Sequence, residues 1–100
     1  MYLYFTFQVV SPSGEYVDAE PIPGCIVVNV GDMLQLWSGN RLKSTRHRVV
    51  VPTDITKPRQ SIAFFVFPNN KCTVTDLKDK ENPVSVNPLE YLMKKFDETY

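Results

Sequence analysis

Residues 59–67, RQSIAFFVF, give the clearest strand pattern of the chain, because they combine strand-like alternation with a high density of apolar side chains. Successive side chains of a strand point to opposite faces of the sheet. One face would carry every second residue from Arg59, namely Arg59, Ser61, Ala63, Phe65 and Phe67. The other would carry Gln60, Ile62, Phe64 and Val66. Because apolar residues fill most positions on both faces, the segment is predicted to be a strand that is buried on both sides.

Upstream of this segment, three further runs have strand character. Residues 2–10 are rich in aromatic and β-branched types, and turn residues separate them from the short run 15–19, which predicts a hairpin. The mostly apolar run 25–30 is predicted to be a well-buried strand.

The middle of the chain holds an ambiguous run and one more strand. Residues 33–37 fit neither a helical nor a strand period clearly, and residues 38–40, SGN, are predicted to form a turn. Residues 46–51 are predicted to form a strand with three side chains on one face: His47, Val49 and Val51.

The last third of the chain changes period. Residues 69–87 are polar and are predicted to form a solvated loop. Asn87 can cap a terminal helix at 88–100, with Pro88 in its first turn and Glu90 at the capping-box position. Helical spacing of 3.6 residues places four apolar residues on one face: Leu89, Leu92, Met93 and Phe96. Roughly six short strands and one helix predict a mainly β sandwich or barrel with a helix outside it.

The composition limits the kind of protein. With 100 residues, of which 43% are apolar and 22% charged, the chain has the size of one domain or part of one. Eleven Lys and Arg balance eleven Asp and Glu, which argues against general nucleic-acid binding. No apolar run is long enough for a membrane helix. Cys25 and Cys72 lack the spacing of a zinc or redox motif, so a reduced, cytoplasmic protein is expected.

Two groups of residues could carry chemistry. An inward guanidinium at Arg59 needs an anionic partner, and Ser61 could donate a hydrogen bond to the same carboxylate. The alternative partner for Arg59 is an acid of the chain itself, Asp32 or Glu20. His47 taken alone is more often a structural residue than a metal ligand.

Several blocks together resemble one enzyme family. These are PGCIVVNVGDML at 23–34, STRHRV at 44–49, RQS at 59–61 and FFV at 64–66. In this order and spacing they are similar to the isopenicillin N synthase-like 2-oxoglutarate- and iron(II)-dependent oxygenases. The similarity extends from about Pro12 into the terminal helix.

The resemblance implies a fold and a set of roles. The fold would be a double-stranded β-helix of the jelly-roll type, of which this chain would hold the later strands and the C-terminal amphipathic helix. His47 matches the late histidine that binds iron. Arg59 and Ser61 match the pair that holds the distal carboxylate of the cosubstrate 2-oxoglutarate, and Phe65 matches a position that lines the substrate pocket. Such a facial metal site leaves coordination positions open for the 2-oxo acid and dioxygen.

One departure from the family pattern is large. The first two iron ligands of the family form a His-x-Asp pair, whereas His47 is the only histidine of this chain. The chain is therefore interpreted as a single partial domain, residues 1–100, that matches the C-terminal portion of such an enzyme. It would be a truncated product, an isolated piece of a longer enzyme or a degenerate relative. No catalytic residue is assigned, and the chain alone is expected to be inactive with an incomplete metal site.

Three functional readings follow. In the first, the parent enzyme is a dioxygenase, an oxidoreductase that oxidises a small organic substrate while 2-oxoglutarate is decarboxylated. In the second, the chain is a non-catalytic scaffold or association module from the same family, which self-associates through open strand edges, with residues 2–10 as the favoured edge. The third reading is an unrelated small all-β binding domain. No nucleic-acid or membrane partner is expected.

Overall fold

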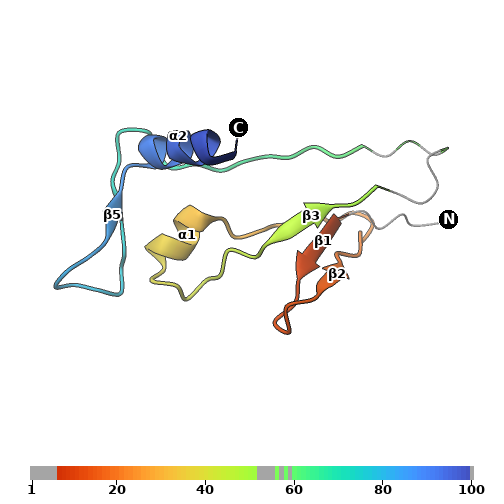
Figure 1. Cartoon of the computed structure of the whole chain (residues 1–100), viewed down its shortest axis with the longest axis horizontal. Helices are drawn as coiled ribbons and strands as arrows, with labels where there is room; N and C mark the ends of the chain where they lie inside the picture. The colour runs from red at the N-terminus through yellow and green to blue at the C-terminus, as the bar shows by residue number, and fades with distance from the viewer. Residues whose placement is uncertain (1–6, 52–55, 57, 59, 100) are drawn as a thin grey trace. The chain divides into compact units, whose positions relative to one another are not determined.

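The structure, a computed structural model, describes residues 7–51, 56, 58 and 60–99 (Figure 1). The chain divides into two compact units. The first comprises Met1–Asn29 and Thr45–Ile62, and the second comprises Val30–Ser44 and Ala63–Tyr100. Neither helix within the described ranges is long and apolar enough to cross a bilayer.

The first unit contains a three-stranded antiparallel sheet made of β1 (Phe7–Val10), β2 (Tyr16–Asp18) and β3 (His47–Val49). The turn between β1 and β2 closes through a hydrogen bond from the Gly14 amide to the Ser11 carbonyl. Gly14 has φ +89°, a conformation that costs glycine little because it has no Cβ. The predicted hairpin is therefore confirmed for the described part of residues 2–19.

Strand β1 lies in the centre of this sheet, since the strand order is β2-β1-β3. It pairs with β2 through Val9 opposite Val17 and with β3 through Val9 opposite His47. Both of its edges are thus used within the unit. The prediction that residues 2–10 offer the open edge for self-association is wrong for Phe7–Val10, because the sequence pattern did not reveal that β3 would occupy that edge.

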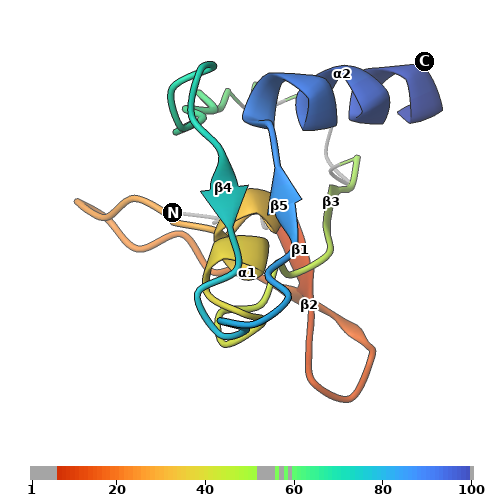
Figure 2. The ribbon, with the colours of Figure 1, turned by 90° about the vertical axis from the view of Figure 1, so that its left-hand side faces the viewer.

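The second unit contains two helices and a small hairpin (Figure 2). The elements are α1 (Asp32–Trp37), β4 (Val74–Thr75), β5 (Ser85–Val86) and α2 (Pro88–Thr99). Figure 2 shows β4 and β5 side by side, as their antiparallel pairing requires. Val74, with 8% of its surface exposed, and Pro88 are buried, so the core of this unit lies at β4 and the start of α2.

The turn predicted at residues 38–40 is present and follows α1 directly. Gly39 and Asn40 both adopt left-handed backbone conformations, with φ of +63° and +62°. Gly39 is buried, and the main-chain amide of Leu77 donates a hydrogen bond to the carbonyl of Trp37 beside it. This contact joins the end of α1 to the loop that follows β4.

The terminal helix is confirmed together with its cap. The Glu90 amide donates a hydrogen bond to Asn87 Oδ1 at 3.1 Å, which is the hydrogen bond expected for Asn87 as the N-cap residue. Asn87 also donates from Nδ2 to the Asn70 carbonyl at 3.0 Å, so the cap holds the preceding segment as well. The interpretation of residues 69–87 as a solvated loop is wrong for β4 and β5, whose two-residue strands are too short to leave a periodic signal.

Two predicted strands are absent from the described residues. Residues 25–30 form no strand, with 87% of Ile26 and 81% of Val28 exposed. Residues 60–67 also form no strand, and Ile62 is 97% exposed. The prediction of buried strands is wrong here because an apolar run becomes a strand only when a neighbour satisfies its main-chain groups, and no described segment pairs with either run.

Candidate functional site

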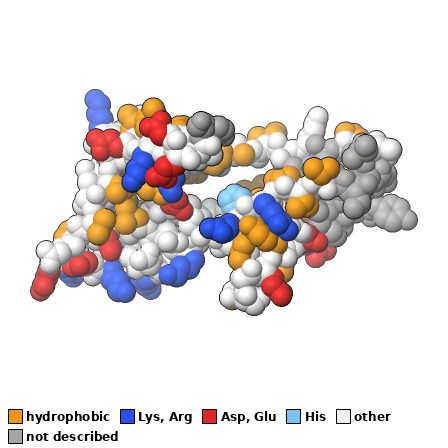
Figure 3. All heavy atoms as spheres, viewed as in Figure 1, with side chains coloured by type: hydrophobic (Ala, Val, Ile, Leu, Met, Phe, Trp, Pro, Cys, Tyr) orange, Lys and Arg blue, Asp and Glu red, His pale blue; other side chains and the backbone are white. Residues whose placement is uncertain are grey.

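His47 is the first residue of β3, and its side chain is exposed. Figure 3 shows this single histidine at the molecular surface. The register places His47 directly opposite Val9, so both side chains lie on the same face of the sheet. The ring of Phe7 lies on this face as well, with its centroid 5.3 Å from the centroid of the imidazole and the two planes inclined by 44°.

One nitrogen of the His47 ring contacts the main chain. Its Nδ1 atom lies 3.1 Å from the carbonyl oxygen of Thr45. A carbonyl oxygen only accepts, so this contact is a hydrogen bond in the ring forms that carry a proton on Nδ1. The neutral ring then has its lone pair on Nε2. This is the arrangement typical of metal-binding histidines, whose other nitrogen donates to a carbonyl or carboxylate.

The other predicted site residues are distributed as follows. Ser61 belongs to the same unit as His47, whereas Phe65 belongs to the second unit. Both side chains are exposed. The ring of Phe65 stacks on that of Phe67, with centroids 6.0 Å apart, as expected for neighbours on one face of an extended chain. Arg59 lies outside the described residues.

A metal ion needs more ligands than His47 provides. Among the described residues, no group of three or more His, Cys, Asp and Glu side chains could hold a metal ion. The described donor set therefore fits one ligand of a facial iron site and does not make a complete site by itself.

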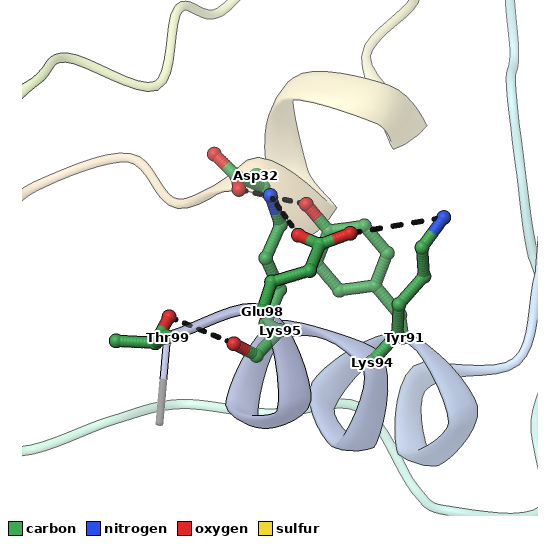
Figure 4. Close-up of polar contacts among 6 residues, drawn as sticks. All are labelled: Asp32, Tyr91, Lys94, Lys95, Glu98 and Thr99. Carbon is green, nitrogen blue, oxygen red and sulfur yellow. Dashed lines mark hydrogen bonds and ion pairs between the residues drawn. The ribbon is translucent and has the colours of Figure 1, made fainter.

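Asp32, one proposed alternative partner of Arg59, has other partners in the second unit. Its Oδ2 atom accepts a 2.7 Å hydrogen bond from the hydroxyl of Tyr91 (Figure 4). A hydrogen bond from the Ser44 side chain, followed by the one from Tyr91, lowers the pKa of Asp32. Burial, and then the contact with Asp32, raises the pKa of Tyr91 to about 12. These contacts connect the start of α1 to α2 across 59 positions of sequence.

We expect this contact to give the second unit a stability that depends on pH. Asp32 has a lowered pKa, so its contribution is present above the unfolded value of about 3.9 and is lost as the pH falls through the folded value. Tyr91 has a raised pKa, so its contribution is present below about pH 10 and is lost as the pH rises to about 12. Tyr91→Phe should destabilise the unit by about 1 kcal/mol near neutral pH, a low value because Asp32 is exposed.

The measurement is thermal unfolding followed by the fluorescence of Trp37, the single tryptophan, which lies in α1. The difference between the native chain and Tyr91→Phe should be largest near pH 7 and shrink towards both extremes. A difference that stays constant from pH 3 to 12 would show that the hydrogen bond makes no contribution. Tyr16→Phe, a tyrosine of the first unit, is the matched control and should leave the Trp37 transition unchanged.

Comparison with known proteins places these observations in a family. The model of the 2OG-Fe(II) oxygenase superfamily matches residues 4–68. A 2-oxoglutarate-dependent dioxygenase, DAO, of Oryza sativa subsp. indica is 40% identical over an alignment of 88 positions, which covers 84% of this chain and 29% of that protein. A homoarginine-6-hydroxylase of Oryza sativa subsp. japonica is 47% identical over 58 residues, covering 58% of this chain and 17% of the relative.

A solved structure has the same fold. An enzyme of Neurospora crassa, crystallised with α-ketoglutarate and thymine, superposes with a TM-score of 0.76 at 35% identity. The superposition covers 95% of this chain and 31% of the larger one. The expected fold class, the later strands of a jelly roll with a C-terminal helix, is thereby confirmed. The chain spans less than a third of the length of each of these three relatives.

Proposed function

This chain belongs to the 2OG-Fe(II) oxygenase superfamily, and we propose that it supplies the C-terminal part of an oxygenase domain that oxidises a small organic substrate. The observation that carries the proposal is the state of His47. Its contact with the Thr45 carbonyl favours the neutral form with the proton on Nδ1, in which the exposed ring offers the lone pair of Nε2 to a metal ion. The strand segment that contains it lies within the family match.

The proposed roles divide between metal and cosubstrate. His47 would contribute one iron ligand, while the other two would come from residues that the described part of this chain does not contain. Iron(II), when bound with 2-oxoglutarate, supplies the oxidising chemistry of the family. Arg59 and Ser61 would hold the distal carboxylate of 2-oxoglutarate, because a planar guanidinium can bind a carboxylate through two hydrogen bonds. The exposed Phe65 ring would form part of the substrate wall.

A small molecule is the substrate class that the relatives support. The Neurospora crassa enzyme was crystallised with thymine, and the rice relative is named for hydroxylating homoarginine. These two molecules differ in charge and shape, so the relatives support a small organic substrate without favouring one chemical type.

A graft tests the proposal. In it, this chain replaces the segment of the rice dioxygenase DAO that aligns with it. The purified graft should convert 2-oxoglutarate to succinate when iron(II) and oxygen are supplied, whereas the rice protein without that segment should not. A folded, monomeric graft that binds iron(II) and does not consume 2-oxoglutarate would contradict the proposed function.

The anion site gives a separate prediction for the chain by itself. Without a complete metal site, 2-oxoglutarate should bind only through its distal carboxylate, and succinate should compete almost equally well. Ligand-observed NMR with both diacids would measure this, and Arg59→Leu should abolish both signals. Arg59→Lys, which keeps the charge and loses the planar fork, should weaken both. Binding that does not depend on Arg59 would show that this arginine has only a structural role.

An association module from the same family is the second candidate function. The exposure of Ile62, Phe64 and Val66 favours it, because runs of exposed apolar residues mark interaction sites or aggregation-prone segments. Among the described residues, β2 and β3 are the edge strands of the three-stranded sheet, and an edge strand can pair with another chain. Sedimentation of the isolated chain separates the two candidates: a concentration-dependent oligomer of the chain, together with a graft that consumes no 2-oxoglutarate, would favour the module.

A further inference from the structure

We propose that Gln8, Asp18 and Arg48 act as positioning residues for His47. They lie on the opposite face of the same sheet and form a single row across its three strands, because Gln8 pairs with Asp18 on one side and with Arg48 on the other. This inference rests on the proposed function only for the role of His47 as a metal ligand. The placement of the ring is a property of the chain itself and can be measured without metal.

The row is connected by polar contacts of fixed direction. Arg48 Nε donates to Gln8 Oε1 at 2.8 Å, and Gln8 Nε2 donates to Asp18 Oδ1 at 2.9 Å. A guanidinium can only donate and a carboxylate can only accept, so the amide between them has one orientation that satisfies both neighbours. The neutral Gln8 thus links a cation on β3 to an anion on β2.

The ring of Tyr16 adds a second contact to Arg48. The guanidinium carbon lies 3.8 Å from the centroid of this ring, within the range of a cation–π interaction. Tyr16 pairs with Val10, two residues beyond Gln8, so its side chain lies on the same face as the row. Arg48 is therefore held by both β1 and β2, although it belongs to β3.

The register of β3 decides which face His47 occupies. Side chains alternate along a strand, so a shift of β3 by one residue would exchange Arg48 and His47 between the two faces. His47 would then lose the ring of Phe7, and the main chain from Thr45 to His47 that forms the Nδ1 contact would change as well. The strands of this sheet are short, so few main-chain hydrogen bonds fix the register. The hydrogen bonds of Gln8 with Asp18 and Arg48 would be lost in such a shift, and they therefore oppose it.

The test uses the fact that His47 is the only histidine, so the imidazole signals of the chain have a single source. Nitrogen-resolved NMR in mildly alkaline solution measures the ratio of the Nδ1–H to the Nε2–H tautomer. Gln8→Glu places two carboxylates side by side, at positions 8 and 18. The ratio should then fall about fivefold, towards that of free histidine in the same buffer, as expected for loss of an ordinary hydrogen bond.

Two further variants make the result specific. Asp18→Asn alone keeps an acceptor oxygen for Gln8 and should leave the ratio unchanged. The double variant of Gln8→Glu with Asp18→Asn should restore the ratio, because the new amide can donate to the new carboxylate. A ratio that stays at the native value in folded Gln8→Glu, or that is not restored in the double variant, would overturn the proposal.

Two variants at Tyr16 provide a second test if Gln8→Glu does not fold. Tyr16→Leu removes the ring under Arg48 and should lower the tautomer ratio, whereas Tyr16→Phe retains the ring and should not. Equal ratios in these two variants would overturn the proposal. Failure of this proposal can be distinguished from failure of the proposed function. If only this proposal is wrong, the variants do not change the tautomer ratio and the graft still consumes 2-oxoglutarate. If only the proposed function is wrong, the graft is inactive and the variants still change the ratio as described.

Discussion

The 2-oxoglutarate turnover of the graft that carries His47→Ala should be more than about 100-fold lower than that of the unmodified graft. The physical reason is the loss of Nε2, the nitrogen that the Thr45 carbonyl leaves with a free lone pair. Changes to residues that only orient a metal ligand already cost about 10- to 100-fold in affinity or activity, so removing the ligand itself should cost more. The measurement is succinate formation at saturating 2-oxoglutarate, over a range of iron(II) concentrations.

Val49→Ala is the matched control for that variant. Val49 follows two residues later in β3, lies on the same face and is exposed, with 61% of its surface accessible, and it offers no ligand atom. The control should keep at least about half of the native turnover, since exposed substitutions usually change stability by about 0.5 kcal/mol or less. Equal losses of turnover in both variants would show that the effect comes from damage to strand β3 and not from removal of the imidazole.

Gly39→Ala should destabilise the second unit by about 3 kcal/mol. Gly39 is buried at φ +63°, a conformation that costs residues with a Cβ about 1–2 kcal/mol. A methyl group there would also meet the Cβ of Lys78 and would lie 2.8 Å from Oδ1 of Asp76. Overpacking of this kind adds about 1–3 kcal/mol. Urea unfolding followed by Trp37 fluorescence measures the loss.

Gly14→Ala separates the two contributions to that loss. Gly14 also has a positive φ, +89°, but no atom lies within 4 Å of the position that its Cβ would take. Its replacement should therefore cost only the backbone term, about 1 kcal/mol, in the unfolding of the first unit. Equal costs at the two glycines would show that the contact of Gly39 with the β4–β5 loop is unimportant.

The features that the sequence predicted correctly are local ones. The cap at Asn87 and the turn at Gly14 depend on residues within a few positions of each other, so their hydrogen bonds could be anticipated from spacing alone. The register of β1 with β2 follows from that turn. The type of α1 could not be predicted, since its six residues are too few for a helical period to be distinct.

The features that the sequence missed depend on residues far apart. The contact between Gln8 and Arg48 spans 40 positions, and alternation alone gave no sign that β1 and β3 would pair. Tyr91 and Asp32 are similarly remote, so spacing along the chain gives no sign of the hydrogen bond between them. The buried strand predicted at residues 59–67 is absent from the described residues 60–67. Periodicity shows which side chains a strand could bury, but it does not show whether a neighbouring strand is present.

We expect His47 to bind a metal ion through Nε2, and a nitrogen-resolved NMR spectrum of its ring measures this binding. The sample is the graft with labelled histidines, measured with and without Zn²⁺, a metal that imidazole also binds and that is suited to NMR. His47→Ala identifies the signals of this ring by their disappearance. We expect zinc to shift the Nε2 signal while Nδ1 stays protonated. Ring signals of His47 that are identical with and without saturating zinc would show that His47 is not a metal ligand.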